Sequence, residues 1–190
     1  MPEGAAHARV RNIKIREITV KRKTITATLL ITWLLFAFGC ASNNPALMVP
    51  DELEVKEPYI GQADIIVVGS NERIVPNAAF KQAIESTLAE SGLFVGEQTA
   101  YRLNVSVLSI KNPAFGLNLK SELRVKWVLY DLQKKAEIFN EIFANEYTAT
   151  VGDHFVAAQR LKIANDNAVK DNIKMALEKI GAGRGKDNEN

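Results

Sequence analysis

The segment from Leu117 to Leu129 gives the clearest strand signal in the 190-residue chain. Its apolar residues share one parity: Leu117, Leu119, Leu123, Val125, Trp127 and Leu129. The other parity is polar: Asn118, Lys120, Glu122, Arg124 and Lys126. Successive side chains of a strand point to opposite faces, so one face of this strand meets a core and the other meets water. The pattern predicts an antiparallel sheet that is covered on one side only.

The hydrophobic period of the flanking sequence predicts three more strands and two helices. The strands are expected at residues 64–69, 102–107 and 137–150, and the helices at 77–91 and 155–180. The resulting order is β-α-β-β-β-α. It predicts an α+β two-layer sandwich, in which a mainly antiparallel four-stranded sheet carries both helices on one face.

The first 23 residues are strongly basic, with seven of the 24 Lys and Arg residues and only two acids. An apolar run at residues 25–38 follows, and then the small residues Gly39, Cys40, Ala41 and Ser42. The run is shorter than the roughly 20 residues that span a bilayer. Basic, apolar and small residues in this order are typical of a cleaved export signal, here residues 1–39. The alternative is an uncleaved membrane helix in which Cys40 is a buried apolar thiol.

The chain after residue 39 has 17 cations and 20 acids, a net charge of −3. It has no stripe of Lys and Arg with interleaved aromatic residues, so no nucleic-acid partner is expected. His154 is its only histidine. A zinc site needs three or four protein ligands, so no metal site is expected. Phosphate-binding loops and the common hydrolase motifs are missing, and we expect no catalytic residues and no enzyme activity.

Domain boundaries follow from composition. Residues 41–60 combine three prolines with polar and acidic residues, which is typical of a tether. Residues 40–60 are therefore predicted to form the lipidated Cys40 and a flexible tether. Residues 182–190 are glycine-rich and polar and are expected to form a disordered tail. The α/β domain is therefore expected to cover residues 61–181.

The sequence Ala37-Phe38-Gly39-Cys40 resembles the lipobox of bacterial lipoprotein signals, in which Gly or Ala precedes an obligatory Cys. Ala37 and Phe38 depart from it, because the family usually has Leu and then a small residue there. The resemblance implies cleavage between Gly39 and Cys40 and acylation of the Cys40 sulfur and amine. This covalent lipid would be the only cofactor and would anchor the chain in the membrane. Ala41, in place of an aspartate, implies the outer membrane, facing the periplasm, with inner-membrane retention as the alternative.

A second resemblance covers about 120 residues of the domain. It is carried by residues 80–94, 101–110 and 125–132 and by the end helix, whose Ala164, Asp166, Ala168, Asn172 and Ile173 give its best single sign. These segments resemble small envelope lipoproteins of the YajG type. The predicted order of helices and strands is similar to that of LptE of the lipopolysaccharide-transport barrel. It is also similar to the orders in the TolB amino-terminal domain and in LpoB-type activators. The resemblance implies a cell-envelope location and an architecture more than a specific molecular function.

The strand at residues 137–150 has apolar residues on both parities. Phe139, Phe143 and Tyr147 share one parity, and Ile138, Ile142 and Ala144 share the other. Only one face of this strand can lie on a two-layer core. The sequence therefore suggests an exposed aromatic stripe that is joined by Val128 and Tyr130 of the neighbouring strand, and such surfaces often mark interfaces. The open alternative is that the tether or a twist of the strand covers the stripe.

These features predict a non-catalytic interaction or assembly module of the cell envelope, anchored by lipid. Its protein partner would dock on the sheet edge or on the outer face of the sheet. Two alternatives are an LptE-like subunit of an outer-membrane barrel and a carrier of a small ligand or lipid. A carrier would need an apolar cavity between the helices and the sheet.

Overall fold

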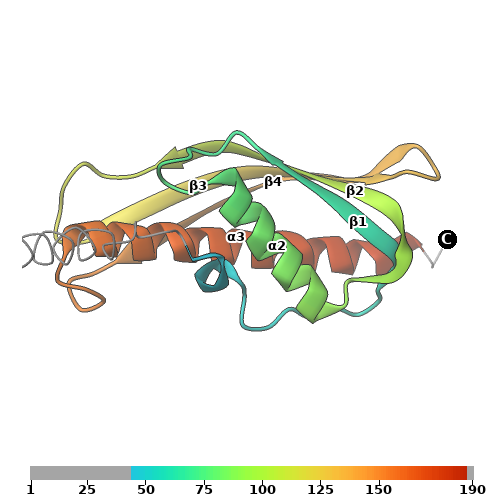
Figure 1. Cartoon of the computed structure of the whole chain (residues 1–190), viewed down its shortest axis with the longest axis horizontal. Helices are drawn as coiled ribbons and strands as arrows, with labels where there is room; N and C mark the ends of the chain where they lie inside the picture. Colours follow the sequence, from blue (N-terminus) through green and yellow to red (C-terminus); the bar gives the residue numbers. More distant parts are fainter. Residues whose placement is uncertain (1–43, 188–190) are drawn as a thin grey trace, which may run out of the picture. The chain divides into compact units, whose positions relative to one another are not determined.

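The computed structural model of the chain describes residues 44–187. Its elements are η1 (Pro45–Met48), β1 (Tyr59–Val68), α2 (Asn77–Ser91), β2 (Phe94–Lys111), β3 (Leu119–Asp131), β4 (Ala136–Ala149) and α3 (Ala157–Asp187) (Figure 1). Apart from the short 3-10 helix η1, this is the predicted order. The predicted signal peptide, its cleavage site and the lipid-attachment residue, Cys40, lie outside the described residues.

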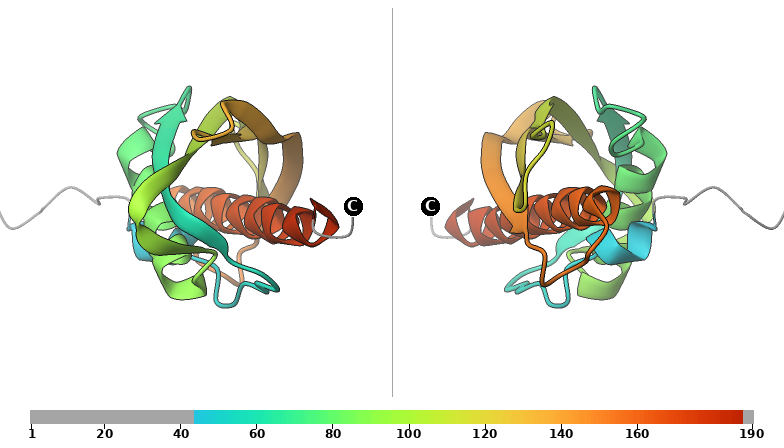
Figure 2. Two further views of the ribbon diagram at one scale, coloured as in Figure 1. Left: turned by 90° about the vertical axis from the view of Figure 1, so that its right-hand side faces the viewer. Right: turned by 90° about the vertical axis from the view of Figure 1, so that its left-hand side faces the viewer.

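The four strands form one sheet in the order β1-β2-β3-β4. β1 runs parallel to β2, and the other two pairs are antiparallel. The connection through α2 allows the parallel pair, because parallel neighbours need a crossover. Both helices lie on one side of the sheet, which curves around α3 (Figure 2). The predicted fold class is confirmed.

The alternation in β3 decides which side of the sheet is covered. Every second residue from Leu119 to Asp131 is buried, including Trp127 at its centre, while Lys120 and Arg124 on the other parity are exposed. The strand begins at Leu119, and Leu117 lies in the preceding loop with 76% of its surface exposed.

The core lies between the sheet and the two helices. α2 contacts β1, and α3 contacts β3 and β4. The predicted apolar face of α2, consisting of Phe80, Ile84 and Leu88, is buried, and the Phe80 ring meets Trp127 edge-on at 6.2 Å between centroids. Alanines at the buried face of α3 let the helix approach the sheet closely; they are Ala164, Ala168 and Ala176.

The segment predicted as a flexible tether is instead part of the domain from Asn44 onward. Met48 of η1 is completely buried, and η1 contacts both α2 and α3. Lys170 of α3 forms an ion pair with Asp51, with 2.6 Å between Nζ and Oδ2. The prediction for this stretch is wrong because local composition carries no information about these long-range contacts.

The carboxyl end of the chain also differs from the prediction. α3 continues to Asp187, through most of the stretch predicted as a disordered tail. Extending a helix costs less than starting one, so a packed helix tolerates several unfavourable glycines at its end. Within residues 44–187, no helix has the length and apolar character needed to cross a membrane.

Candidate interaction surfaces

The outer face of the sheet is the side that neither helix covers (Figure 2). Val128 lies on it between Asn104 and Asn140, and Tyr130 lies between Arg102 and Glu137. Strand register places exposed apolar side chains around these two residues: Ile66, Val68 and Ile142. This face is therefore a mixed surface in which apolar side chains alternate with polar ones.

The three aromatic residues predicted for the same stripe lie on the opposite face. Phe139, Phe143 and Tyr147 stand across from Leu129, Val125 and Ser121, which are buried against the helices. The aromatic side chains are half-buried and pack against the core. The rings of Phe139 and Phe143 are stacked 6.3 Å apart.

The five predicted interface residues therefore do not form one surface. Val128 and Tyr130 face outward, whereas the aromatic residues of β4 face α3. Both parities of β4 are apolar, so the sequence pattern does not say which side of the strand meets the core. The contact of α3 with β4 decides it, and α3 covers what was predicted to be exposed.

An asparagine seam, made of Asn145 in β4 with Asn165 and Asn172 in α3, fixes β3 and β4 to this helix. Asn172 is fully buried, and its Oδ1 accepts a hydrogen bond of 2.9 Å from Trp127 Nε1. Its Nδ2 donates to Asn145 Oδ1 at 2.8 Å, and Asn145 Nδ2 donates to the carbonyl of Ala168 at 2.7 Å. Asn165 Oδ1 accepts from Ser121 Oγ at 2.8 Å. Asparagine is unfavourable in helices, and these bonds explain its use here.

β4 is an edge strand of 14 residues. It contains neither proline nor a cation, and its charged residues are Glu137, Glu141 and Glu146. Glu146 accepts from Lys120 Nζ at 3.0 Å on the outer face. Edge strands present unpaired backbone groups, and natural proteins often protect them with lysine, proline or a very short length. β4 has none of these three features, and no strand within residues 44–187 pairs with its outer edge.

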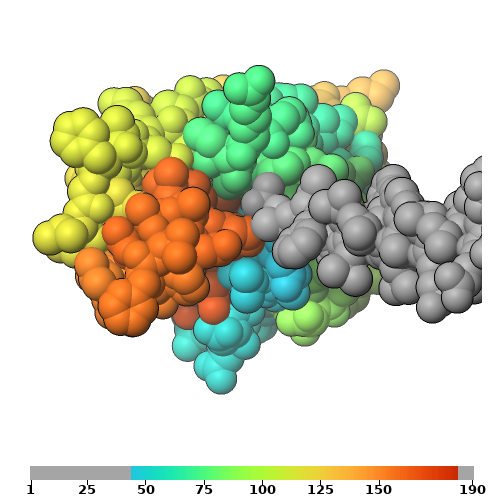
Figure 3. All heavy atoms as spheres, turned by 60° about the vertical axis from the view of Figure 1, so that its left-hand side comes forward, coloured from blue at the N-terminus to red at the C-terminus, as the bar shows by residue number. Residues whose placement is uncertain are grey.

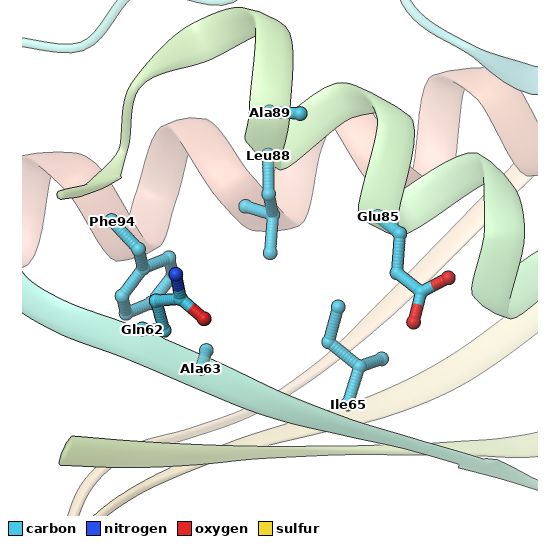
Figure 4. A pocket seen from close by; sticks show the side chains of 7 residues that line it. All are labelled: Gln62, Ala63, Ile65, Glu85, Leu88, Ala89 and Phe94. Atoms are coloured by element: carbon cyan, nitrogen blue, oxygen red, sulfur yellow. The ribbon is translucent and has the colours of Figure 1, made fainter. Parts of the chain in front are cut away.

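A cleft of about 320 Å³ lies between α2 and β1 (Figure 4). Ile65, Leu88 and Phe94 form its apolar wall, and the Glu85 carboxylate and the Gln62 amide also line it. Two further clefts, of about 390 and 360 Å³, border α2 and the segment around Pro50, and Glu90 lines both. Glu85 is the one carboxylate that lines the first cleft, whereas two or more carboxylates line each of the other two.

Residues 44–187 contain no group of three or more His, Cys, Asp or Glu side chains that is placed to hold a metal ion. His154, the one histidine of these residues, is exposed and accepts a hydrogen bond from the Val156 amide at 3.0 Å through Nδ1. This contact stabilises the loop before α3.

Comparison with solved structures gives a match to a DUF330-family protein from Xanthomonas campestris, with a TM-score of 0.57 and 9% sequence identity. The match covers 75% of this chain and 94% of that protein. The two proteins share a fold. A minor lipoprotein from Acinetobacter baumannii also matches, with a TM-score of 0.44, 14% identity and coverage of 70% and 96%. At 9% identity the likeness to the Xanthomonas protein concerns the fold alone. No family model and no curated protein matches the chain.

Proposed function

We propose that this chain is a lipid-anchored, non-catalytic envelope protein that docks onto a partner through β4 and the outer face of the sheet. The observation that carries the proposal is the position of β4. The asparagine seam and α3 hold its inner side, while no helix within residues 44–187 covers its outer side or its outer edge. A strand that is fixed in this way is ready to pair with a strand of another protein.

The proposal places the protein at the outer membrane, facing the periplasm, with an acylated Cys40 as its anchor. This part rests on the sequence of the first 42 residues and on the likeness to YajG-type lipoproteins. The partner is an envelope protein rather than a nucleic acid, because the chain after the signal has a net charge of −3.

The chemistry of β4 restricts the partner further. A second copy of this chain paired through β4 would bring acidic strands together, and like charges on paired strands are destabilising. A partner strand that carries lysine or arginine would meet Glu137, Glu141 and Glu146 favourably. The proposed partner therefore offers an extended, basic segment.

The competing functions require other features. A small-ligand carrier needs an apolar cavity, and the clefts beside α2 contain carboxylates. An LptE-like role inside a barrel is a variant of the same proposal, in which the outer face of the sheet meets a barrel wall.

A photo-crosslinking amino acid at position 142 tests the docking surface. Ile142 is half exposed on the outer face of β4, and Met175 of α3 is a control of similar exposure. In envelopes of cells that express the full chain, we expect irradiation to join position 142, but not position 175, to a discrete protein. Addition of Glu146→Lys should weaken this crosslink, because it reverses a charge of the edge strand. Equal labelling from both positions, or none from position 142, would contradict the proposal.

A further inference from the structure

Two loops at the end of the molecule where α3 begins expose large apolar side chains. In the β2–β3 loop (residues 112–118), 89% of Phe115 and 76% of Leu117 are exposed. In the β4–α3 loop (residues 150–156), the values are 89% for Phe155 and 55% for Val156. These four residues are named the apolar tip. Figure 3 shows the two loops, in yellow and orange, next to each other on the face turned to the viewer.

A buried arginine connects the two loops. Arg160 of α3 is only 5% exposed. Its Nη1 donates to the carbonyls of His154 and Phe155 at 2.8 and 2.7 Å, and its Nη2 reaches the carbonyl of Gly116 at 3.5 Å. The guanidinium thus occupies backbone acceptors on the inner side of both loops. The apolar side chains are exposed on loops whose backbones these hydrogen bonds hold together.

Charge is scarce in these loops. Asp153 is the only charged residue in residues 112–118 and 150–156. Its Oδ2 accepts from the Thr150 amide at 2.7 Å and from Thr150 Oγ1 at 2.9 Å, so the carboxylate is used within its own loop. Transfer of an apolar, nearly uncharged surface from water to the acyl-chain boundary of a bilayer costs little free energy. Apart from Asp153, this surface offers no acidic or basic side chain to a complementary patch on a protein.

The proposed anchor would bring the apolar tip close to a membrane. The described part of the domain begins at Asn44, whose Oδ1 caps η1 by accepting from the Ala46 amide at 3.2 Å. Asn44 follows Cys40 by only four positions, and four extended residues reach at most about 14 Å. An acylated Cys40 would therefore hold the domain against the bilayer surface. In Figure 3, η1, in cyan, and both loops appear on the same face.

We infer that the apolar tip inserts into the lipid bilayer as a second membrane contact beside the acyl anchor. This inference rests on the proposed lipid anchor and adds an orientation to it. The amino end of α3 would face the membrane. The opposite end, where the Tyr59 hydroxyl donates to the carbonyl of Ile180, would point away from it. Two contacts would fix the tilt of the domain and hold β4 in one orientation toward its partner.

Quenching by brominated lipids tests the insertion. The full chain, processed and acylated in cells, is reconstituted into vesicles of phosphatidylcholine and phosphatidylglycerol whose acyl chains carry bromine. In a Phe155→Trp variant we expect tryptophan emission to fall about twofold relative to vesicles without bromine, because the side chain reaches the acyl boundary. The native Trp127 is fully buried in the core and gives a constant background. An Ile60→Trp variant, at a residue that is 65% exposed and next to Tyr59 at the far end, should not be quenched.

A second pair of variants tests whether the loops insert together. Adding Phe155→Asp to a Phe115→Trp variant should abolish its quenching, whereas adding Ile60→Asp should leave it unchanged. Circular dichroism confirms that each variant is folded. Equal quenching at positions 155 and 60, or none at either, overturns the inference. So does an apolar tip that crosslinks to an envelope protein and is not quenched, since that result assigns the surface to a protein contact.

These outcomes are separable from failure of the anchor. Fatty-acid labelling of Cys40 without quenching at position 155 leaves the proposed anchor intact and rejects only the insertion. Absence of labelling rejects the anchor itself.

Discussion

Asn172 is the residue on which the docking of α3 against the sheet depends most directly. Its amide joins the indole of Trp127, the side chain of Asn145 and the carbonyl of Phe143. Substitution Asn172→Ala leaves these groups buried without a partner, and each such group costs about 1–3 kcal/mol. We expect the free energy of unfolding to fall by about 2–4 kcal/mol. Urea unfolding followed by Trp127 fluorescence measures it.

Asn167 supplies the control, because it lies on the same helix and bonds only within it. Its Nδ2 donates to the carbonyl of Ile163 at 2.9 Å. Asn167→Ala should lose less than about 1 kcal/mol. If both substitutions cost the same, the asparagine seam has no special role.

Asp166 makes stability depend on pH. Burial raises the pKa of this carboxyl above its usual 3.8, although the Lys162 ammonium, 2.8 Å away, acts in the opposite direction. The folded state therefore holds the proton more tightly than the unfolded state does. The stabilisation is full below pH 3.8 and is lost as the pH rises through the raised pKa.

Asp166→Asn removes this titration. The free energy of unfolding of the wild type, minus that of the variant, should decrease as the pH rises above 3.8 and should then level off. Urea unfolding of both proteins across this range gives the difference. A difference that stays constant, or that grows with pH, would show that Asp166 is not the group responsible.

Among the elements, β3 and β4 show what a hydrophobic pattern does and does not determine. β3 has one apolar parity, so its buried face follows directly from the sequence. β4 has two apolar parities, and only its contacts with α3, through Asn145 and Asn172, select the inner face. The pairing of β1 with β2 depends likewise on the whole connection through α2, which no local pattern specifies.

Neighbouring residues of β4 should respond differently to the same substitution. Phe143→Asp places a carboxylate against the core beside α3, and we expect a loss of about 2–4 kcal/mol. Ile142→Asp, on the half-exposed outer face, should change the free energy of unfolding by less than about 1 kcal/mol. Thermal melts followed by circular dichroism compare them. A stable Phe143→Asp protein that has lost its partner would instead support the exposed aromatic stripe.

Loops were the least predictable elements, although they carry a readable signal. Leu117 continues the parity of β3 but lies in the preceding loop, because Pro113 and Gly116 just before it favour a turn. Phe155, predicted at the start of the helix, lies in the loop before α3, which begins at Ala157. Large apolar residues among turn-forming residues have no core to enter, which is consistent with the exposure of Phe115.

For the whole molecule, the amino-terminal segment decides where the domain begins. Met48→Ala removes a fully buried side chain between η1 and the two helices and should cost about 2–4 kcal/mol. Leu47→Ala, one residue earlier and 54% exposed, should cost less than about 1 kcal/mol. Urea unfolding of both variants is the measurement. Equally small losses of stability in both variants would support a flexible tether in this segment.

The order of elements and the mainly antiparallel sheet could be predicted from the sequence, because the spacing of hydrophobic residues distinguishes the helices from the strands. The burial of Met48 could not, because it arises from elements that are far apart in the chain. A short link between Cys40 and the domain follows from that burial, and the second membrane contact depends on it.

The central claim is that Cys40 anchors this domain in a membrane. Labelling with a radioactive fatty acid, combined with the mass of the mature protein, tests it most directly. We expect the wild-type chain to incorporate label and to begin at an acylated Cys40, and Cys40→Ser to remain unlabelled and uncleaved. Equal incorporation in both proteins, or a wild-type chain that retains residues 1–39, would contradict the account.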